Sequence, residues 1–243
     1  QSAYENYNFL DVFQKMVQFC VGELGGFYLD IIKDRQYTTK TDSLARRSCQ
    51  TAMYHILEAM TRWMAPVLSF TADEIWQFMP APANGEREDS VFLATWYQGL
   101  VAIDAESLQG RQFWSQVMEA KHAVNKRIEE ERKAGKVKGS LTTSVNLYCE
   151  GDLFDVLTSL GDELRFVLIS SEATVLSLAG EGHEQALPSE LEGLLVSVVP
   201  NPNQKCERCW HHRPEVGSIA AHPSLCHRCV ENIEGDGEKR TFA

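Results

Sequence analysis

The sequence lacks long hydrophobic runs and any secretion leader. None of its 243 residues lies in a stretch that approaches about eighteen consecutive apolar side chains, and no basic, then apolar, then small-residue segment stands at its start. We therefore expect no membrane span and no export. Because the chain begins at Gln1 within a helical pattern and without a methionine, we also expect it to be a piece of a longer protein.

Catalytic signatures are absent as well. The sequence has no Gly-x-Ser-x-Gly elbow, no phosphate-binding glycine loop, no His-Glu-x-x-His pair and no paired carboxylates in a recognisable acid–base setting. This absence argues against a free-standing enzyme, and we assign no catalytic residue.

Basic residues are scarce in one segment. The formal net charge is −11, yet residues 139–199 alone carry 10 acidic side chains and one basic side chain, whereas residues 100–138 carry 8 basic and 6 acidic ones. A polyanionic partner should avoid 139–199 and approach the segments in which basic residues cluster.

Cysteine occurs in an odd number, seven. Cys20, Cys49 and Cys149 are scattered within apolar stretches, and we expect them to be small buried hydrophobes rather than redox or catalytic groups. Unpaired cysteines of this kind favour a reduced, cytoplasmic location.

The other four cysteines form the most specific motif in the chain. Cys206 and Cys209, and then Cys226 and Cys229, are two C-x2-C pairs separated by sixteen residues. Each pair can direct two thiolates from one tight turn to the same ion, so the spacing predicts one tetrahedral Zn2+. Four thiolates leave no open position for water, and we therefore expect a structural metal that stabilises a segment with few apolar residues of its own.

Hydrophobic periodicity predicts a helical bundle in residues 1–98. Apolar residues spaced by three and four predict a helix over 4–33. Gly25 and Gly26 within it indicate a bend or a close contact with another helix.

Two more helices of this bundle have recognisable ends. Ser43 is a good N-cap for a helix that runs to Trp63. Thr71 and Glu74 form a capping box for a short third helix, and the polar stretch 81–89 after it should be a solvated loop.

The rest of the chain predicts three further parts, which makes the fold class α+β and multidomain. Residues 99–138 should form a connecting basic helix, 139–199 a small acidic α/β module, and 200–243 the four-cysteine zinc finger. Within the α/β module we expect, in chain order, a strand around 145–149, helices in 152–169, and strands at 173–178 and 193–199.

A basic corner follows the first helix. Basic side chains beside Tyr37 could neutralise phosphates while the tyrosine stacks on an unpaired base, although a solvated corner between two helices would look the same. The cations of this corner are Lys33, Arg35, Lys40, Arg46 and Arg47. The basic face of 121–138 is less specific, because Glu129 to Glu131 could pair with it along the helix.

Basic and aromatic residues also surround the cysteines: Lys205, Arg208, Trp210 and Arg213. Some of these cations could offset the charge of the thiolates. Trp210 could be the hydrophobic plug of the module or an exposed platform for a base, and we favour the plug. The nearby histidines, His211, His212, His222 and His227, we expect at the surface, since four thiolates already fill a zinc shell.

Several long motifs resemble one family. KCERCW from Lys205, LCHRC from Leu225 and the ending GDGEKRTFA look like the C-terminal zinc finger of bacterial isoleucyl-tRNA synthetases. FYLDIIKDRQYT from Phe27, the run ARRSCQTAMYHILEAMTRWMAPVLSFTADEIW from Ala45, and GDELRFVL from Gly161 are similar to the anticodon-binding and C-terminal regions of the same family. The resemblance covers essentially the whole chain.

The resemblance implies a parent protein that is a class I ligase, which joins isoleucine to its tRNA with ATP and Mg2+. The HIGH-type and KMSKS-type motifs of the ATP site and the editing domain are missing here, so the fragment alone should be inactive. Its implied work is to bind isoleucine tRNA at the anticodon end, as a monomer joined to upstream catalytic and editing domains, and so to position the acceptor end. The implied tRNA contacts are Lys33, Arg35, Tyr37, Lys40, Arg46, Arg47, Lys205, Arg208, Trp210 and Arg213.

Two other functions remain open at this point. DNA glycosylases of the formamidopyrimidine type end in a similar four-cysteine finger, but they begin with a proline nucleophile followed by glutamate, whereas this chain begins Gln1-Ser2. The finger could also brace the parent enzyme without touching RNA, an interpretation that the acidic segment keeps open.

Overall fold

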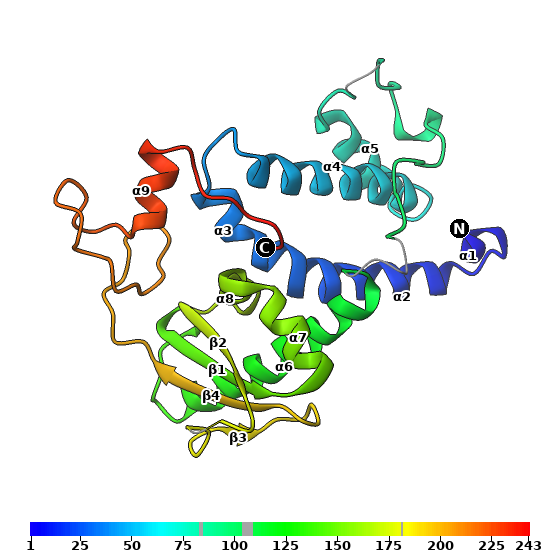
Figure 1. Ribbon diagram of the computed structural model, residues 1–243. Coiled ribbons are helices and arrows are strands. Elements are labelled where there is room, and N and C mark those ends of the chain that lie inside the picture. The colour runs from blue at the N-terminus through cyan, green and yellow to red at the C-terminus, as the bar shows by residue number, and fades with distance from the viewer. Residues whose placement is uncertain (83–84, 104–108, 181) are drawn as a thin grey trace. The chain divides into compact units, whose positions relative to one another are not determined.

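The computed structural model describes residues 1–82, 85–103, 109–180 and 182–243 (Figure 1). The chain divides into two compact units. The first unit consists of Gln1–Tyr28 and Arg47–Ala102, and the second of Leu29–Arg46 and Ile103–Ala243. The helix-rich chain with one small mixed sheet confirms the predicted α+β class.

The first unit is helical. Its elements are α1 (Ser2–Glu5), α2 (Phe9–Phe19), the π-helical segment η1 (Cys20–Tyr28), most of α4 (Leu44–Met64), α5 (Ser69–Phe78) and the 3-10 turn η2 (Val91–Leu93). Asn8 caps α2, because its side-chain oxygen accepts the N–H of Asp11 at 3.3 Å. The helices expected over 4–33 and from Ser43 to Trp63 are thus present. The first of them is interrupted between α1 and α2.

The two glycines of the first helix lie in its π-helical segment, whose widened turn they accommodate. A Cβ atom at Gly25 would lie 2.8 Å from the carbonyl oxygen of Cys20, and one at Gly26 would lie 3.0 Å from that of Val21. Side chains do not fit against these carbonyls, which stand five residues earlier in the widened helical turn. The backbone therefore continues through η1 into α3 without ending the helix.

The core of the first unit lies around Trp76, which is buried together with Ala65, Ala72, Met79 and Val91. The indole N–H of Trp76 donates to the carbonyl of Glu88 at 2.7 Å, which fixes the following loop on α5. The capping box at Thr71 is wrong: α5 already begins at Ser69, whose hydroxyl donates to the Ala65 carbonyl at 3.0 Å.

The loop at 81–89, which we expected to be solvated, has one residue that pairs with a buried carboxylate. Residues 83 and 84 lie outside the described residues, but Arg87 is not solvated, since its side chain is only 12% exposed. Its guanidinium pairs with Glu58, which is 2% exposed, and lies 4.4 Å from the ring centroid of Trp76. Arg62 of α4 is the second partner of Glu58. A buried carboxylate requires such partners, and this requirement draws Arg87 inward.

The second unit contains the sheet and the remaining helices. Its elements are α3 (Leu29–Thr38), the first turn of α4, α6 (Arg111–Lys133), η3 (Ser140–Thr142), β1 (Thr143–Cys149), α7 (Gly151–Ser159), η4 (Gly161–Glu163), α8 (Leu164–Leu168), β2 (Glu172–Ser177), β3 (Leu187–Pro188), β4 (Leu195–Pro200) and α9 (His227–Glu234). The predicted N-cap is confirmed, because the Ser43 hydroxyl accepts the N–H of Arg46 at 3.2 Å.

The sheet has the order β2-β1-β4-β3, with β1 and β2 parallel and β4 antiparallel to both β1 and β3. In the central strand, Leu147 lies opposite Val175 on one side and Val196 on the other. We expected β1 to be half-buried, but Ser144 and Tyr148, which alternate with the apolar residues, are also buried. The expected order of strand, helix, strand, strand is confirmed, and the short β3 is an addition.

Helices α6, α7 and α8 pack beside the sheet (Figure 1). Lys121 of α6 is 2% exposed, and its ammonium donates to the carbonyl of Val167, near the end of α8, at 2.6 Å. Burial lowers the pKa of Lys121 to about 8, and the charge of Asp30 opposes this shift. The later cations of α6 have carboxylate partners, as in the pairs Arg132–Glu129 and Arg127–Glu130, both at 2.7 Å.

Candidate nucleic-acid interface and metal centre

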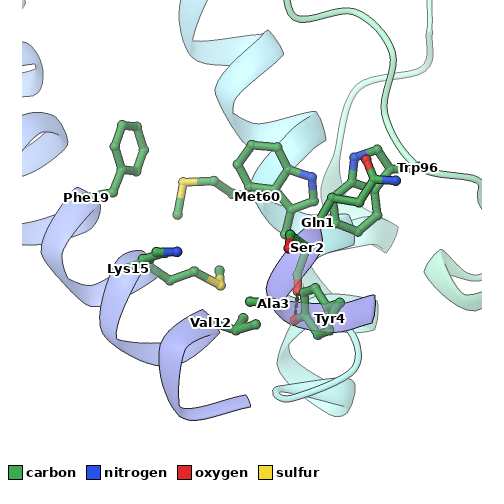
Figure 2. A pocket seen from close by; sticks show the side chains of 11 residues that line it. Gln1, Ser2, Ala3, Tyr4, Val12, Lys15, Phe19, Met60 and Trp96 are labelled. Atoms are coloured by element: carbon green, nitrogen blue, oxygen red, sulfur yellow. Dashed lines mark hydrogen bonds between the residues drawn. The ribbon is translucent and has the colours of Figure 1, made fainter. Parts of the chain in front are cut away.

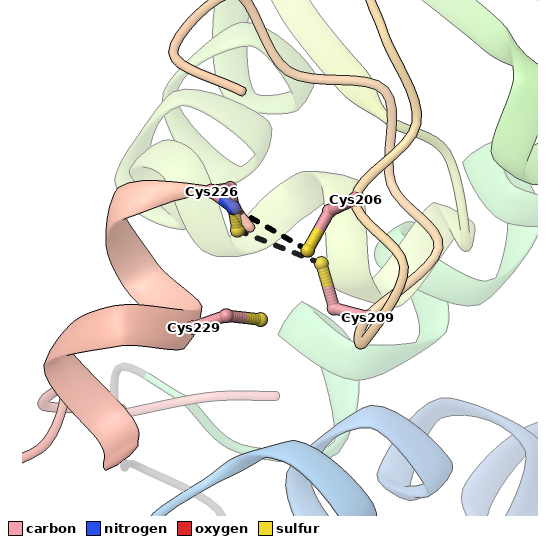
Figure 3. A group of neighbouring side chains, drawn as sticks. All are labelled: Cys206, Cys209, Cys226 and Cys229. Atoms are coloured by element: carbon pink, nitrogen blue, oxygen red, sulfur yellow. Dashed lines mark hydrogen bonds between the residues drawn. The ribbon is translucent and has the colours of Figure 1, made fainter. Parts of the chain in front are cut away.

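The four predicted metal ligands come together in the second unit (Figure 3). Cys206 and Cys209 stand in one tight turn, while Cys226 is the N-cap of α9 and Cys229 lies in its first turn. All four are buried, and their sulfur atoms lie within 4.8 Å of one another. The helix N-terminus beside two of them favours the anionic thiolate form.

The geometry of this cluster fits Zn2+. A Zn–S bond of about 2.3 Å places two sulfurs of a tetrahedron about 3.8 Å apart, and the sulfurs of Cys209 and Cys226 are separated by 3.7 Å. The N–H of Cys226 also points to the sulfur of Cys206 at 3.4 Å. Four thiolates at such distances repel one another strongly unless a cation lies between them.

The structure brings four of the ten predicted RNA-binding residues to one cavity. Lys33, Tyr37, Arg208 and Trp210 line a cavity of about 340 Å3 in the second unit, which we call the Tyr37–Trp210 cavity. The rest of its wall is formed by Asp30, Ile31, Asp34, Thr38, Leu141, Phe166, Ile169, Cys209 and His211.

Two aromatic residues of the Tyr37–Trp210 cavity are open to solvent. Tyr37 is 77% exposed, and Trp210 is 59% exposed. The ammonium of Lys205 lies 5.1 Å from the ring centroid of Trp210, which adds a cation–π contact. Lys33 pairs with Asp30 at 2.8 Å, and this hydrogen bond raises the pKa of Lys33. Exposed aromatic rings beside cations are the groups that bind unpaired bases and their phosphates.

The other predicted contacts are placed elsewhere. Arg35 is only 8% exposed, and the ammonium of Lys40 donates to the carbonyl of Gly235 at 2.9 Å. Arg213 pairs with Glu215 at 3.3 Å. Arg46 is half-buried, while Arg47 is exposed and belongs to the first unit. Arg35 therefore has little surface to offer a ligand.

Two expectations around the cysteines are wrong. Trp210 is not the hydrophobic plug, because its side chain is 59% exposed. The buried position belongs to His211, which we expected at the surface and which is 2% exposed. Its ring packs edge-on against Phe166 at 5.5 Å, and its Nδ1–H donates to the Cys209 carbonyl at 3.2 Å.

A buried ionic network, which the sequence analysis did not predict, links the zinc module to α3. Asp34 accepts two hydrogen bonds from the guanidinium of Arg228, at 2.7 and 2.8 Å, and a third from Arg240. Glu238 accepts from the same two arginines at 3.0 and 3.1 Å. Burial alone would raise the pKa of Asp34, but Arg228 and then Arg240 hold it below its usual value.

The last residues of the chain are fixed by a second carboxylate. Glu163 accepts the backbone N–H groups of Thr241, Phe242 and Ala243 at 2.7, 2.7 and 2.8 Å. Arg240, which is almost fully buried, lies with its guanidinium 3.3 Å from the ring centroid of Phe166. These contacts join residues far apart in the sequence, so no local spacing could have predicted them.

A second cavity, in the first unit, has a different character (Figure 2). It has a volume of about 370 Å3 and is lined mainly by apolar and aromatic side chains, among them Tyr4, Met60, Trp63 and Trp96. Its cation, Lys15, is paired with Asp11 at 2.8 Å. The rings of Tyr4, Trp63 and Trp96 are half-buried, whereas Tyr37 and Trp210 are exposed, so this cavity offers less open stacking surface to a base.

Comparisons with known proteins agree with the motifs. Residues 1–147 match a family described as the anticodon-binding domain of tRNA ligase, and residues 203–232 match a zinc finger found in FPG and IleRS. The chain is 55% identical over 243 residues to an isoleucine–tRNA ligase of Marinomonas sp., 55% identical to one of Pseudomonas aeruginosa, and 56% identical to one of Stutzerimonas stutzeri. Each match covers the whole chain but only 25% of the relative, so the chain spans about a quarter of the length of these proteins.

These matches bear on the metal and on the fold. The zinc-finger match includes all four clustered cysteines, which supports a structural Zn2+. No helix in the described parts of the chain combines the length and apolar character that crossing a membrane requires. Because the first match spans more than half of the sequence, the chain belongs to the family of anticodon-binding domains of tRNA ligases.

Proposed function

We propose that this chain binds isoleucine tRNA at its anticodon end and thereby positions the acceptor end for ligation elsewhere in a longer enzyme. The family match supports tRNA binding, and the isoleucine–tRNA ligases that the chain resembles support the choice of tRNA. The single observation that carries the proposal is the Tyr37–Trp210 cavity, where exposed aromatic rings and cations stand together. Anticodon bases are unpaired, and stacking beside phosphate-neutralising cations is how proteins hold such bases.

Within this proposal the zinc has a supporting role. Cys206, Cys209, Cys226 and Cys229 hold one Zn2+, and the closed tetrahedron leaves no place for a reacting water. The metal fixes the turn that carries Lys205, Arg208 and Trp210 next to α3. The guanidinium of Arg208 reinforces this placement, since it donates to the Thr38 carbonyl at 2.6 Å and lies 3.8 Å from the sulfur of Cys229.

The burial of the cations narrows the set of proposed RNA contacts. Tyr37 and Trp210 stack on bases, and the exposed Lys33, Lys205 and Arg47 contact phosphates. The half-buried Arg46, Arg208 and Arg213 remain proposed contacts with less surface to offer. Arg35 and Lys40 instead stabilise the fold, because the first is buried and the second bonds a backbone carbonyl.

The catalytic properties belong to the longer protein. We propose that it is a monomeric, cytoplasmic ligase that uses ATP and Mg2+ in upstream catalytic and editing domains, and that this chain alone forms no aminoacyl-adenylate. Residues 1–98, 99–138, 139–199 and 200–243 are our proposed modules. A DNA glycosylase is not favoured, because the match to tRNA ligases covers the first 147 residues.

An equilibrium titration tests the proposal. The chain should bind isoleucine tRNA more tightly than the same tRNA with an exchanged anticodon, and more weakly as salt increases, because phosphate contacts release counterions. Equal affinity for both tRNAs would reject anticodon recognition, and affinity independent of salt would reject phosphate contact. If no tRNA binds at any practical concentration, bracing of the longer enzyme becomes the better account.

A further inference from the structure

Two residues of the Tyr37–Trp210 cavity have a backbone conformation that residues other than glycine rarely adopt. Ile169 has a φ of 57° and Trp210 a φ of 67°, both in the left-handed region that glycine occupies freely. For a β-branched residue such as isoleucine this conformation is a clear outlier. Of the described non-glycine residues, the third with positive φ is Tyr7, which belongs to the first unit and does not line this cavity.

Helix termination explains the backbone of Ile169 but not its side chain. Ile169 is the residue at which α8 ends, and its N–H donates to the Phe166 carbonyl at 3.2 Å. The next N–H, of Ser170, donates to the Arg165 carbonyl at 2.9 Å. Glycine is the residue that best fits this left-handed helix end. The branched, half-buried side chain of Ile169 adds nothing to this turn, and it forms part of the cavity wall.

Trp210 likewise combines a positive φ with a side chain that lines the cavity. Its N–H donates to the Cys206 carbonyl at 2.9 Å and so closes the metal-binding turn, which any residue could do. The indole itself is 59% exposed and also lines the cavity. The fold thus keeps two unfavourable backbone conformations, and both present a large apolar side chain to one cavity. Strain of this kind accumulates at binding sites.

The remaining wall suits a flat heteroaromatic ring. Leu141, Phe166 and Ile31 supply apolar surface, and Tyr37 a second exposed aromatic ring. His211 closes part of the wall, since it is 2% exposed and bonds the Cys209 carbonyl through Nδ1 at 3.2 Å.

We propose that the Tyr37–Trp210 cavity takes one unpaired nucleobase of the RNA and that Ile169 is a specificity-determining residue of this base site. Tyr37 and Trp210 stack on the ring, and Ile169 contacts its edge. The inference rests on the proposed tRNA binding, which it extends from a surface to a single base. A volume of about 340 Å3 is ample for one base.

The first test measures both the stability and the RNA affinity of a variant that relieves the strained backbone at Ile169. Ile169→Gly relieves the left-handed conformation, so its urea denaturation midpoint should rise, while its affinity for the anticodon stem–loop of isoleucine tRNA falls on the order of tenfold. Tyr7→Gly is the matched control, since it relieves the same conformation outside the cavity and should leave the affinity unchanged. Tyr37→Ala, at an exposed helical position, keeps the fold intact and should weaken binding about 5- to 150-fold, the range for loss of one base–aromatic stack.

The second test locates the base. Each loop nucleotide of the stem–loop is replaced in turn by an abasic ribose, and the affinity of each RNA is measured with the unaltered chain and with Ile169→Gly and Tyr37→Ala. One abasic position should lower the affinity of the RNA for the unaltered chain. The same position should change the affinity for either variant little, because the missing base and the replaced side chain belong to the same contact. If the stem–loop binds but no position shows this coupling, or if Ile169→Gly binds like the unaltered chain, the base site is refuted and tRNA binding stands. If no RNA binds the unaltered chain, both proposals fail.

Discussion

Replacing Asp34 by asparagine should loosen the zinc module from α3. The carboxylate of Asp34 is 14% exposed, and its partners Arg228 and Arg240 are 11% and 1% exposed. Asparagine retains one acceptor oxygen but no charge, so both guanidinium groups lose part of their compensation. Removing one partner of a buried ion pair costs about 3–5 kcal/mol. Because Arg228 also pairs with Glu238 at 3.0 Å, we expect a loss near the lower value, about 3 kcal/mol.

The pH dependence of this effect follows from the pKa of Asp34. The folded protein holds this pKa below its usual value, so the stabilisation is complete above about pH 5 and is lost as the pH falls through the lowered pKa of the folded state. The difference in stability between the unaltered chain and Asp34→Asn should therefore be constant from pH 5 to neutrality and shrink at more acidic pH.

Hydrogen exchange of the α9 amides measures the effect where it acts, because their opening free energy reports the docking of this helix. Asp42→Asn is the matched control, since Asp42 is exposed and its replacement should change the opening free energy by less than about 0.5 kcal/mol. A loss below about 1 kcal/mol for Asp34→Asn, or a difference that does not depend on pH, would contradict the assigned network.

Two further predictions concern single buried groups. Lys121 has a pKa lowered to about 8, so the unfolded chain binds more protons than the folded chain between about pH 8 and 10. In urea denaturation, the unaltered protein should therefore gain up to about 3 kcal/mol of stability over this range relative to Lys121→Met. If the stabilities of the two proteins change in parallel with pH, the burial of Lys121 is refuted. Elemental analysis should find about one Zn per chain, with order in 203–232 lost on chelation, and Cys229→Ser should lose the metal while Cys20→Ser retains it. A finger that stays folded without metal would contradict the structural role.

Local features of the sequence predicted local structure well. The two C-x2-C pairs place their sulfurs correctly because each pair needs only one tight turn, and periodic apolar residues predicted α4 and α6 because the helical repeat is intrinsic to the chain. The Ser43 cap is equally local. Such features depend on neighbours within a few residues, and the sequence shows them directly.

The details of the site depend on contacts between distant residues, which no spacing reveals. The pairing of Asp34 with Arg228 and Arg240 joins residues about 200 positions apart, and so does not show in any local pattern. The burial of His211 beside Phe166 likewise depends on a contact between distant residues. The π-helical turn at Gly25 was missed for a related reason, since glycine permits several backbone solutions and the surrounding helix selects one.

Photo-crosslinking tests the central claim most directly. Isoleucine tRNA with a photoreactive base in the anticodon loop should crosslink to the chain, and mass spectrometry should identify peptides that contain Tyr37 or Trp210. Crosslinks confined to the first unit, or to peptides of the second unit that contain no residue of the cavity wall, would contradict the assignment of the Tyr37–Trp210 cavity as the place where this chain holds the anticodon.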